Sequence, residues 1–140
     1  MGAESYLVVS SGRASCYRWL FLAAAVWNAL SAGAVLFILT NAKFRQELEI
    51  PGPADTIGLQ LLASCLFVFG LGYYWVSRDL SRNRDLVKLG VIGKPLVFLV
   101  FFGHALTHEI PMRLVLPSIV DLLFGALFLE FLLRTRTKAL

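Results

Sequence analysis

Charged residues are scarce in this sequence of 140 residues. Only 16% are Asp, Glu, Lys or Arg, whereas a soluble domain carries roughly 25%. With 58% apolar residues, too few polar side chains remain to cover a water-soluble globule, so the composition predicts an integral membrane protein. Apolar runs use up almost the whole length, which excludes a large extramembrane enzyme and a nucleic-acid-binding domain.

Cysteine is also sparse, and several well-known motifs are missing. Cys16 and Cys65 are the only two cysteines and no Cys-x-x-Cys pair occurs, so neither a structural disulfide nor a disulfide-generating redox site is supported. The sequence contains no phosphate-binding loop, Rossmann glycine fingerprint or nucleophile elbow. These absences leave the polar residues inside the apolar runs as the candidates for function.

Four apolar segments are long enough to cross a bilayer core of about 30 Å. The third contains Lys94 and Pro95, and the fourth contains Asp121 and Glu130, two acids that we expect to face protein or water. The sequence thus predicts an all-α fold, a four-helix transmembrane bundle that forms a single domain over residues 1–140. The predicted helices cover approximately residues 19–40, 56–77, 86–108 and 114–133.

Basic residues gather on one side of the predicted membrane. Ten Lys and Arg residues lie before the first segment, between the second and third, in the first half of the third, or after the fourth, and three lie on the other side. The positive-inside rule therefore places both termini in the cytoplasm. Tyr73, Tyr74 and Trp75 agree with this orientation, because aromatic residues favour the interface. The net charge of +4 reflects topology, and we expect no nucleic-acid partner.

Two histidines and one acid form the first candidate site. His104 and His108 lie one turn apart on the third predicted helix, and a hairpin with its midpoint near Met112 would bring Asp121 to the depth of His104. A carboxylate beside an imidazole in a dry site shifts the pKa of both groups and supports proton transfer. His104 and Asp121 are therefore candidate catalytic residues. The alternative is that they only satisfy each other and hold the hairpin together.

The same hairpin geometry places Lys94 level with Glu130. We interpret these two residues as a structural ion pair, although Glu130 can also pair with Arg134 four residues later. Phenylalanines near the site could shape an apolar pocket, and they are equally typical of core or lipid contacts. The candidate binding residues are Gln60, Asn28, His108, Phe101 and Phe124.

Metal and haem binding would both depend on the two histidines. The sequence His104-Ala105-Leu106-Thr107-His108 lacks the His-Glu-x-x-His pattern of zinc proteases. Bis-histidine haem ligation within one chain would need imidazoles from facing helices, whereas both lie on one predicted helix. We therefore predict no metal site and no cofactor.

Two local patterns predict structural details. Residues 43–47 are typical of a turn of interfacial helix, and residues 51–53, Pro-Gly-Pro, of a rigid turn. Ala25, Ala29 and Gly33 repeat at four-residue spacing, which favours a close contact with another helix along this stripe.

Three short segments carry a resemblance to a known family. Residues 70–75, 78–84 and 89–94 read GLGYYW, RDLSRNR and LGVIGK. Together they resemble the centre of small bacterial four-helix membrane proteins that are broadly DoxX-like, over about a third of the chain. The resemblance implies a compact bundle in the bacterial cytoplasmic (inner) membrane, in some cases part of a membrane oxidoreductase system. It supplies no catalytic residues.

Three functions fit these observations. The first is an accessory subunit or lipid-binding component of a membrane complex, with membrane lipid, other subunits or a second copy as partners. The second is a membrane-embedded isomerase or cyclase, which would act on an isoprenoid-like or quinone-like lipid through His104 and Asp121. The third is a small proton-coupled transporter in which Asp121 titrates and oligomerisation completes the path.

Overall fold

The computed structural model describes residues 5–8, 11–48 and 56–139. Four of its helical segments are long and apolar enough to cross a membrane, which confirms the four long apolar helices that the sequence predicts. The first helix begins well before residue 19, and the third ends at Leu106 rather than at residue 108. The elements are, in order, β1 (Ser5–Val8), α1 (Ser11–Thr40), α2 (Ala42–Glu47), α3 (Thr56–Arg78), α4 (Arg84–Leu106), the 3-10 helix η1 (Met112–Val115), α5 (Leu116–Arg134) and β2 (Arg136–Ala139).

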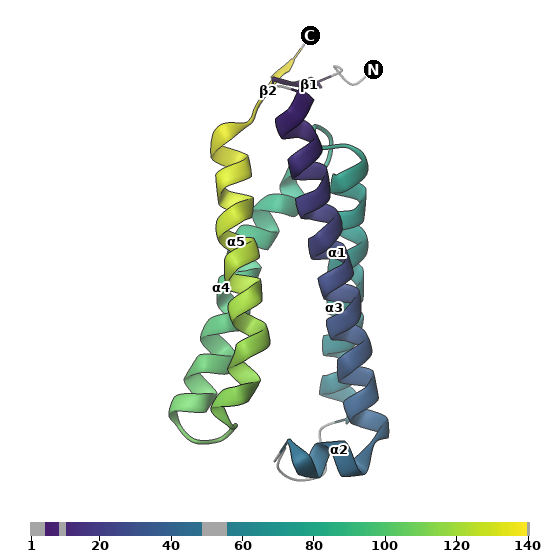
Figure 1. Ribbon diagram of the computed structural model, residues 1–140, viewed down its shortest axis with the longest axis vertical. Coiled ribbons are helices and arrows are strands. Elements are labelled where there is room, and N and C mark those ends of the chain that lie inside the picture. Colours follow the sequence, from purple (N-terminus) through teal and green to yellow (C-terminus); the bar gives the residue numbers. More distant parts are fainter. Residues whose placement is uncertain (1–4, 9–10, 49–55, 140) are drawn as a thin grey trace.

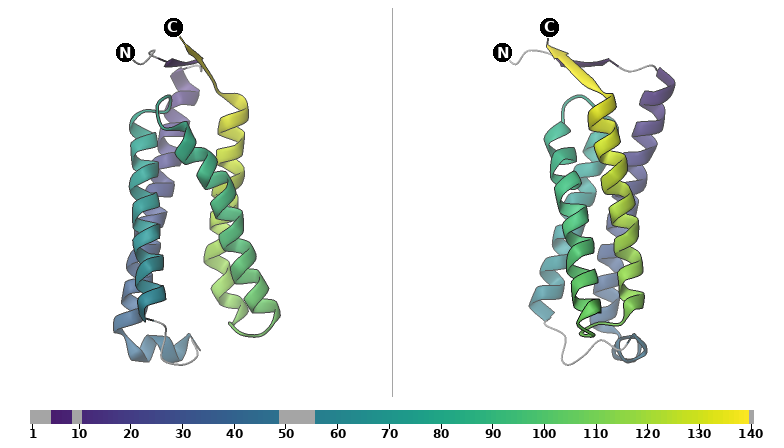
Figure 2. Two further views of the ribbon diagram at one scale, coloured as in Figure 1. Left: turned by 180° about the vertical axis from the view of Figure 1, so that it is seen from behind. Right: turned by 90° about the vertical axis from the view of Figure 1, so that its left-hand side faces the viewer.

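The four long helices form two antiparallel pairs. Helix α1 lies along α3, and α4 lies along α5 (Figure 1). The pairs meet at the end of the molecule that carries both termini and diverge toward the opposite end, as Figure 1 and the left view of Figure 2 show. Strands β1 and β2 pair antiparallel at the closed end, with Ser5 opposite Ala139 and Val8 opposite Arg136. The two termini therefore lie at the same end of the bundle.

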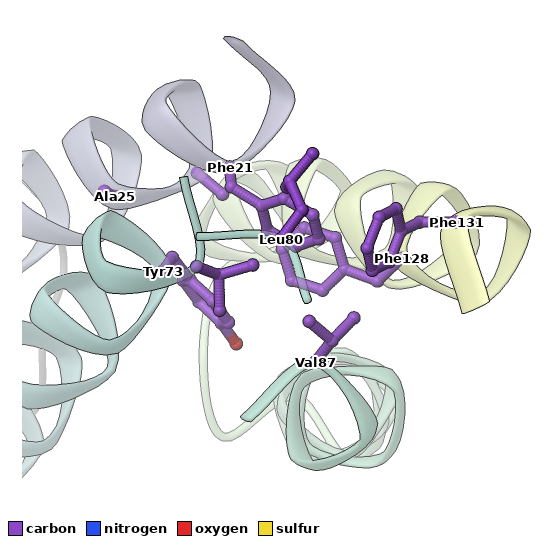
Figure 3. Packing of buried hydrophobic residues seen from close by; sticks show 9 residues of the cluster. Phe21, Ala25, Tyr73, Leu80, Val87, Phe128 and Phe131 are labelled. Atoms are coloured by element: carbon purple, nitrogen blue, oxygen red, sulfur yellow. The ribbon is translucent and has the colours of Figure 1, made fainter. Parts of the chain in front are cut away.

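An aromatic core joins the two pairs near the closed end (Figure 3). Phe21 of α1 and Tyr73 of α3 each pack on Phe128 of α5, with ring centroids 4.9 Å apart in both contacts. Phe131 packs edge-on against Phe21 at 5.0 Å, and Val87 adds a fully buried side chain from α4. Aromatic contacts of this kind contribute roughly 0.5–1.5 kcal/mol each beyond area burial. All four long helices thus contribute to one core.

Glycines allow close approach at two places in this packing. A Cβ on Gly90 would lie 2.7 Å from the Tyr73 hydroxyl and 2.8 Å from the Phe128 ring, so only glycine fits there. A Cβ on Gly70 would lie 3.2 Å from the carbonyl oxygen of Ala25, which is where α1 and α3 touch. No atom lies within 4 Å of a Cβ placed on Gly33, so the predicted small-residue stripe makes this contact at Ala25 and not at Gly33.

Arg84 ties the start of α4 to the end of α5. Its guanidinium donates to the Thr135 hydroxyl at 2.6 Å and to the Thr135 carbonyl at 2.8 Å, and it lies 5.2 Å from the centroid of the Phe131 ring. These bonds satisfy acceptors at a helix C-terminus, where carbonyl groups have no partner within the helix. The closed end of the bundle is therefore held by polar as well as aromatic contacts.

A short turn precedes α4. The Asp79 carboxylate accepts from the Ser81 hydroxyl at 2.6 Å and from the amides of Ser81 and Arg82 at 3.0 and 3.2 Å. These hydrogen bonds, the Ser81 hydroxyl first among them, hold the pKa of Asp79 below its ordinary value. The carboxylate thus fixes the connection between the two helix pairs.

Helix α2 lies at the open end of the bundle, as Figure 1 shows, and it confirms the helical turn predicted over residues 43–47. Its first turn is capped by Asn41, whose side-chain oxygen accepts from the Phe44 amide at 3.1 Å. Phe44 packs edge-on against Phe37 of α1 at 5.4 Å, and Arg113 donates to the Glu47 carbonyl at 2.8 Å. Residues 51–53, the predicted rigid turn, lie outside the described residues.

Candidate functional site

A buried cation lies among the helices. Lys94 of α4 is 5% exposed, and its ammonium group donates hydrogen bonds to the Asp121 carboxylate of α5 and, at 3.2 Å, to the Asn28 side-chain oxygen of α1. Asn28 in turn donates to the Leu66 carbonyl of α3 at 3.3 Å. We call Asn28, Lys94 and Asp121 the polar cluster. Its hydrogen bonds reach all four long helices.

Aromatic rings flank the cation. The Lys94 nitrogen lies 5.4 Å from the ring centroid of Tyr73 and 5.4 Å from that of Phe124, within the range of a cation–π interaction. Asp121 is also buried, at 8% exposure, so the ion pair is largely withdrawn from solvent and lipid. A buried charge needs an opposite charge and hydrogen bonds to be tolerated, and the polar cluster supplies both.

The sequence spacing places the cluster on the same helix faces as the aromatic core. Asn28, Lys94 and Asp121 each lie seven residues, or about two helical turns, from a core residue of their own helix. Two turns correspond to about 10 Å along the axis, in each case toward the open end. The core partners are Phe21, Val87 and Phe128.

Small residues allow the short Asp121 side chain to reach its partner. Gly125 lies one turn beyond Asp121, and a Cβ there would lie 3.3 Å from the Pro95 ring and 3.5 Å from the Lys94 Cβ. Helices α4 and α5 therefore approach closely at this level, as small residues permit in membrane bundles. A larger residue at this position would push Lys94 away from the carboxylate.

The predicted pairing of His104 with Asp121 is wrong. His104 Nδ1 lies 2.6 Å from the Glu109 carboxylate, and both side chains are exposed. The chain leaves α4 at Leu106 and folds back, so the Glu109 amide donates to the His104 carbonyl at 3.0 Å. The hydrogen bond from His104 holds the pKa of Glu109 below its ordinary value. His104 thus belongs to the loop and not to a site with Asp121.

The predicted pairing of Lys94 with Glu130 is also wrong. Glu130 pairs with Arg134 of the same helix at 3.0 Å, and Lys94 pairs with Asp121. The turn lies between Leu106 and the start of η1 rather than at Met112. Lys94 lies about three turns before the end of α4, and Asp121 lies about two and a half turns after the start of η1, so the two residues come to a similar depth.

The other predicted binding residues separate into two groups. Asn28 and Phe124 contact the Lys94 ammonium group, as described above. Gln60 and His108 are exposed, and Phe101 is half-buried. Within the described ranges, none of these last three hydrogen-bonds to the polar cluster. His108 adopts a positive φ of 61°, which is uncommon for a residue other than glycine.

Tyr73 is the site residue that the sequence reasoning missed. It was assigned to the interface with its neighbours, yet it is 2% exposed, whereas Tyr74 and Trp75 are 42% and 55% exposed. Gly70, one turn before Tyr73, faces α1 and marks the packed side of α3. A small residue one turn away was therefore the signal that separates the buried tyrosine from its exposed neighbours.

Metal ligands do not converge within the described part of the chain. Among the described residues, no group of three or more His, Cys, Asp or Glu side chains is placed to hold a metal ion. Cys16 and Cys65 are free thiols and both are exposed. The polar cluster is therefore the site whose chemistry has to be explained.

Fold and site together define a class: a protein of four apolar helices, each long enough to cross a membrane, around a buried lysine–aspartate pair. Comparison with protein-family models, with curated proteins and with solved structures finds no match.

Proposed function

We propose that the protein is a lipid-binding component of a membrane, with the polar cluster as the place where the polar end of the lipid binds. One observation carries the proposal. The buried Lys94–Asp121 pair and its bond to Asn28 lie about two turns beyond the aromatic core, on the side where the helix pairs diverge (Figure 1). Ionisable residues inside a membrane bundle are costly and rare, which makes them candidates for a functional site.

The charges of the cluster favour a lipid whose polar end is neutral. Lys94 and Asp121 compensate each other, so an ionic ligand group would meet a repulsive charge of its own sign. The surrounding helices expose large apolar side chains, including Leu96 and Leu99 of α4, at 54% and 57%. An apolar tail can lie along such surfaces within the hydrocarbon region without a cost in desolvation.

The geometry supports the two alternatives less well. An isomerase or cyclase that uses His104 and Asp121 lacks its acid–base pair, because His104 is engaged with Glu109. A proton-coupled transporter would use the Lys94–Asp121 pair, yet it would also need a second copy to complete a path. Lipid binding needs only the groups that the chain itself brings together.

We also propose the topology and location of the protein. The end that carries both termini is rich in exposed basic side chains, which favours the cytoplasmic side of the membrane. The DoxX-like resemblance favours a bacterial inner membrane. The exposed basic residues at this end are Arg13, Arg18, Arg78, Arg82, Lys88 and Arg134.

Native mass spectrometry tests the proposal. The full chain is extracted in mild detergent, stripped of lipid, and exposed again to a lipid extract. We expect the wild type to retain lipid and the double variant Lys94→Met/Asp121→Leu to lose it. Replacing a buried ion pair by apolar residues of similar size is often tolerated, so this variant should fold.

The matched control is the double variant Glu130→Gln/Arg134→Met. It removes an ion pair from an exposed face of α5 and should bind lipid like the wild type. Equal retention of lipid by the wild type and the Lys94/Asp121 variant would overturn the proposal. Proton-driven uptake of a solute by vesicles that contain the chain would favour the transporter instead.

A further inference from the structure

Two exposed arginines at the closed end, Arg18 of α1 and Arg78 of α3, have no carboxylate partner among the described residues. The acids described at this end are each engaged with a neighbour in the sequence: Asp79 with the Ser81 hydroxyl, Asp85 with Lys88 and Glu130 with Arg134. The charges of the two arginines are therefore not compensated within the described part of the chain.

The pairing of α1 with α3 places the two arginines at nearly the same depth. The two helices run antiparallel side by side (Figure 1), and they touch where a Cβ on Gly70 would lie 3.2 Å from the Ala25 carbonyl oxygen. Arg18 lies seven residues before Ala25, and Arg78 lies eight residues after Gly70. At about 1.5 Å per residue, both arginines lie about 10–12 Å from this contact, in the same direction.

The helical phase places both arginines on the outer side of this contact. Eight residues rotate α3 by about 80° from the contact, which turns Arg78 away from the core residue Tyr73. On α1, Arg18 lies within about 20° of Ala25, on the side opposite to the core residue Phe21. The two guanidinium groups thus belong to the edge between α1 and α3 that faces away from α4 and α5. We call this edge, with Arg18 and Arg78, the arginine seam.

Aromatic side chains mark the arginine seam as a level of the membrane–water interface. Trp19 follows Arg18 and is 68% exposed, and Tyr74 and Trp75, within about one turn before Arg78, are 42% and 55% exposed. Trp and Tyr favour the depth at which lipid headgroups lie. Large apolar side chains are exposed on the same two helices further toward the open end: Val26, Phe67 and Leu71. The seam therefore combines cations at headgroup depth with a surface that suits acyl chains.

We infer that the arginine seam binds the headgroup of an anionic phospholipid, with Arg18 and Arg78 on its phosphate. Guanidinium groups match phosphate oxygens through paired, charge-assisted hydrogen bonds, and neither group has to leave an acid of the described chain to form them. Basic residues between transmembrane helices on the cytoplasmic side favour anionic headgroups. The inference goes beyond the proposed function, because the balanced charges of the polar cluster favour a neutral lipid at a different place.

Native mass spectrometry of the delipidated full chain in mild detergent tests this inference. The chain is titrated with phosphatidylglycerol and with phosphatidylcholine of identical acyl chains, which differ in net charge. We expect the wild type to bind phosphatidylglycerol at least about fivefold more tightly than phosphatidylcholine. The double variant Arg18→Gln/Arg78→Gln should reduce this preference to less than about twofold.

The matched control is the double variant Lys88→Gln/Arg134→Gln. It removes the same charge from the same end, but from basic residues that are paired with acids, at 2.7 and 3.0 Å. We expect its preference for phosphatidylglycerol to stay within about twofold of the wild-type value. An equal loss of preference in both double variants would mean that net charge alone attracts the lipid, and the arginine seam would then not be a site.

Glycerol phosphate separates a lipid from a free phosphate, because it carries the same phosphate group without acyl chains. A tenfold excess of it should leave phosphatidylglycerol bound, since the lipid also contacts apolar side chains. Displacement of the lipid by an equal concentration of glycerol phosphate would assign the seam to a soluble phosphate compound and overturn the inference.

The headgroup masses keep this inference distinct from the proposed function. The variant Lys94→Met/Asp121→Leu should lose the neutral lipid of the polar cluster and keep phosphatidylglycerol. Unchanged binding of phosphatidylglycerol in Arg18→Gln/Arg78→Gln would overturn the arginine seam and leave the polar cluster as proposed. Retention of the neutral lipid by the Lys94/Asp121 variant, with phosphatidylglycerol lost from the arginine variant, would overturn the proposed function alone.

Discussion

The Lys94–Asp121 pair allows a decisive test of the structure. The single variant Lys94→Met leaves a buried carboxylate without its cation, and Asp121→Leu leaves a buried ammonium without its anion. Removal of one partner from a buried pair costs about 3–5 kcal/mol. Replacement of both partners by apolar residues of similar size is often neutral or stabilising. The free energy of unfolding of the double variant should therefore lie within about 1 kcal/mol of the wild-type value.

The magnitude follows from the burial of the pair. Both residues are less than a tenth exposed, so solvent screens their attraction poorly, and two unit charges 4 Å apart at an effective dielectric constant of 20 attract by about 4 kcal/mol. Two single losses of about 3 kcal/mol each and a double variant near zero give a coupling energy of about 6 kcal/mol. Individual polar contacts in membrane proteins average only about 0.6 kcal/mol, so the measured coupling energy clearly separates a buried ion pair from an ordinary polar contact.

Reversible unfolding of the full chain in mixed micelles measures this coupling. The cycle Glu130→Gln with Arg134→Met is the control, because that pair is half-exposed and should show a coupling below about 1 kcal/mol. A coupling near 0.6 kcal/mol for Lys94 and Asp121 would show that the two charges do not meet in a buried site. The polar cluster, and the binding function built on it, would then be wrong.

Three further predictions follow from contacts elsewhere in the bundle. Gly90→Ala should lower the free energy of unfolding by about 1–3 kcal/mol, because its Cβ would overlap the buried tyrosine hydroxyl and a core phenylalanine, whereas Gly93→Ala, in open space, should be neutral or slightly stabilising. Arg84→Ala should cost about 1.5–3 kcal/mol of stability, as measured by the same unfolding assay, because it removes charged hydrogen bonds at the end of α5. Glu109 should titrate below the ordinary value of 4.5 in a carbon NMR experiment, and His104→Ala should return it toward 4.5. Because the pKa of Glu109 is lowered, its contribution to the stability of the fold is present above the ordinary pKa and is lost as the pH falls through the lowered pKa. An unchanged titration midpoint of Glu109 in His104→Ala would contradict the contact.

Composition and the length of apolar runs were sufficient to predict the helices. A bilayer leaves few structural solutions to a chain, because backbone groups in lipid must be paired within helices or closed barrels. Four runs therefore become four helices, even with Lys94 and Pro95 inside the third. The helix ends were harder to predict, because polar residues such as Arg13 and Arg18 are compatible with helix in the interfacial region.

The partner of each charge was not predictable from the sequence. Which residues lie at the same depth across a hairpin depends on where the turn lies. The non-helical segment between Leu106 and Met112 places the middle of the turn about one helical turn before the predicted midpoint near Met112. Because the two arms of a hairpin run in opposite directions, the partner moves two residues for each residue by which the midpoint moves. A midpoint between four and five residues earlier therefore exchanges Glu130 for Asp121, which lies nine residues before it, as the partner of Lys94. His104 was misassigned for a related reason, because the loop that follows it folds back and supplies Glu109 as a nearer acid.

The face of each helix that carries the polar cluster nevertheless follows from the spacing between its polar residue and a core residue. Asn28, Lys94 and Asp121 each lie seven residues from a large apolar residue that packs in the core, and seven residues return a helix to nearly the same face. On each of these three helices, the polar residue lies on the same face as the core residue. It could face lipid only if the helix also turned its core residue outward. The three side chains must therefore point into the bundle, and since they are a cation, an anion and an amide, they must bind one another or a ligand. Once the core residues are known, the helical spacing alone identifies the members of the site, even where the depth of the hairpin is misjudged.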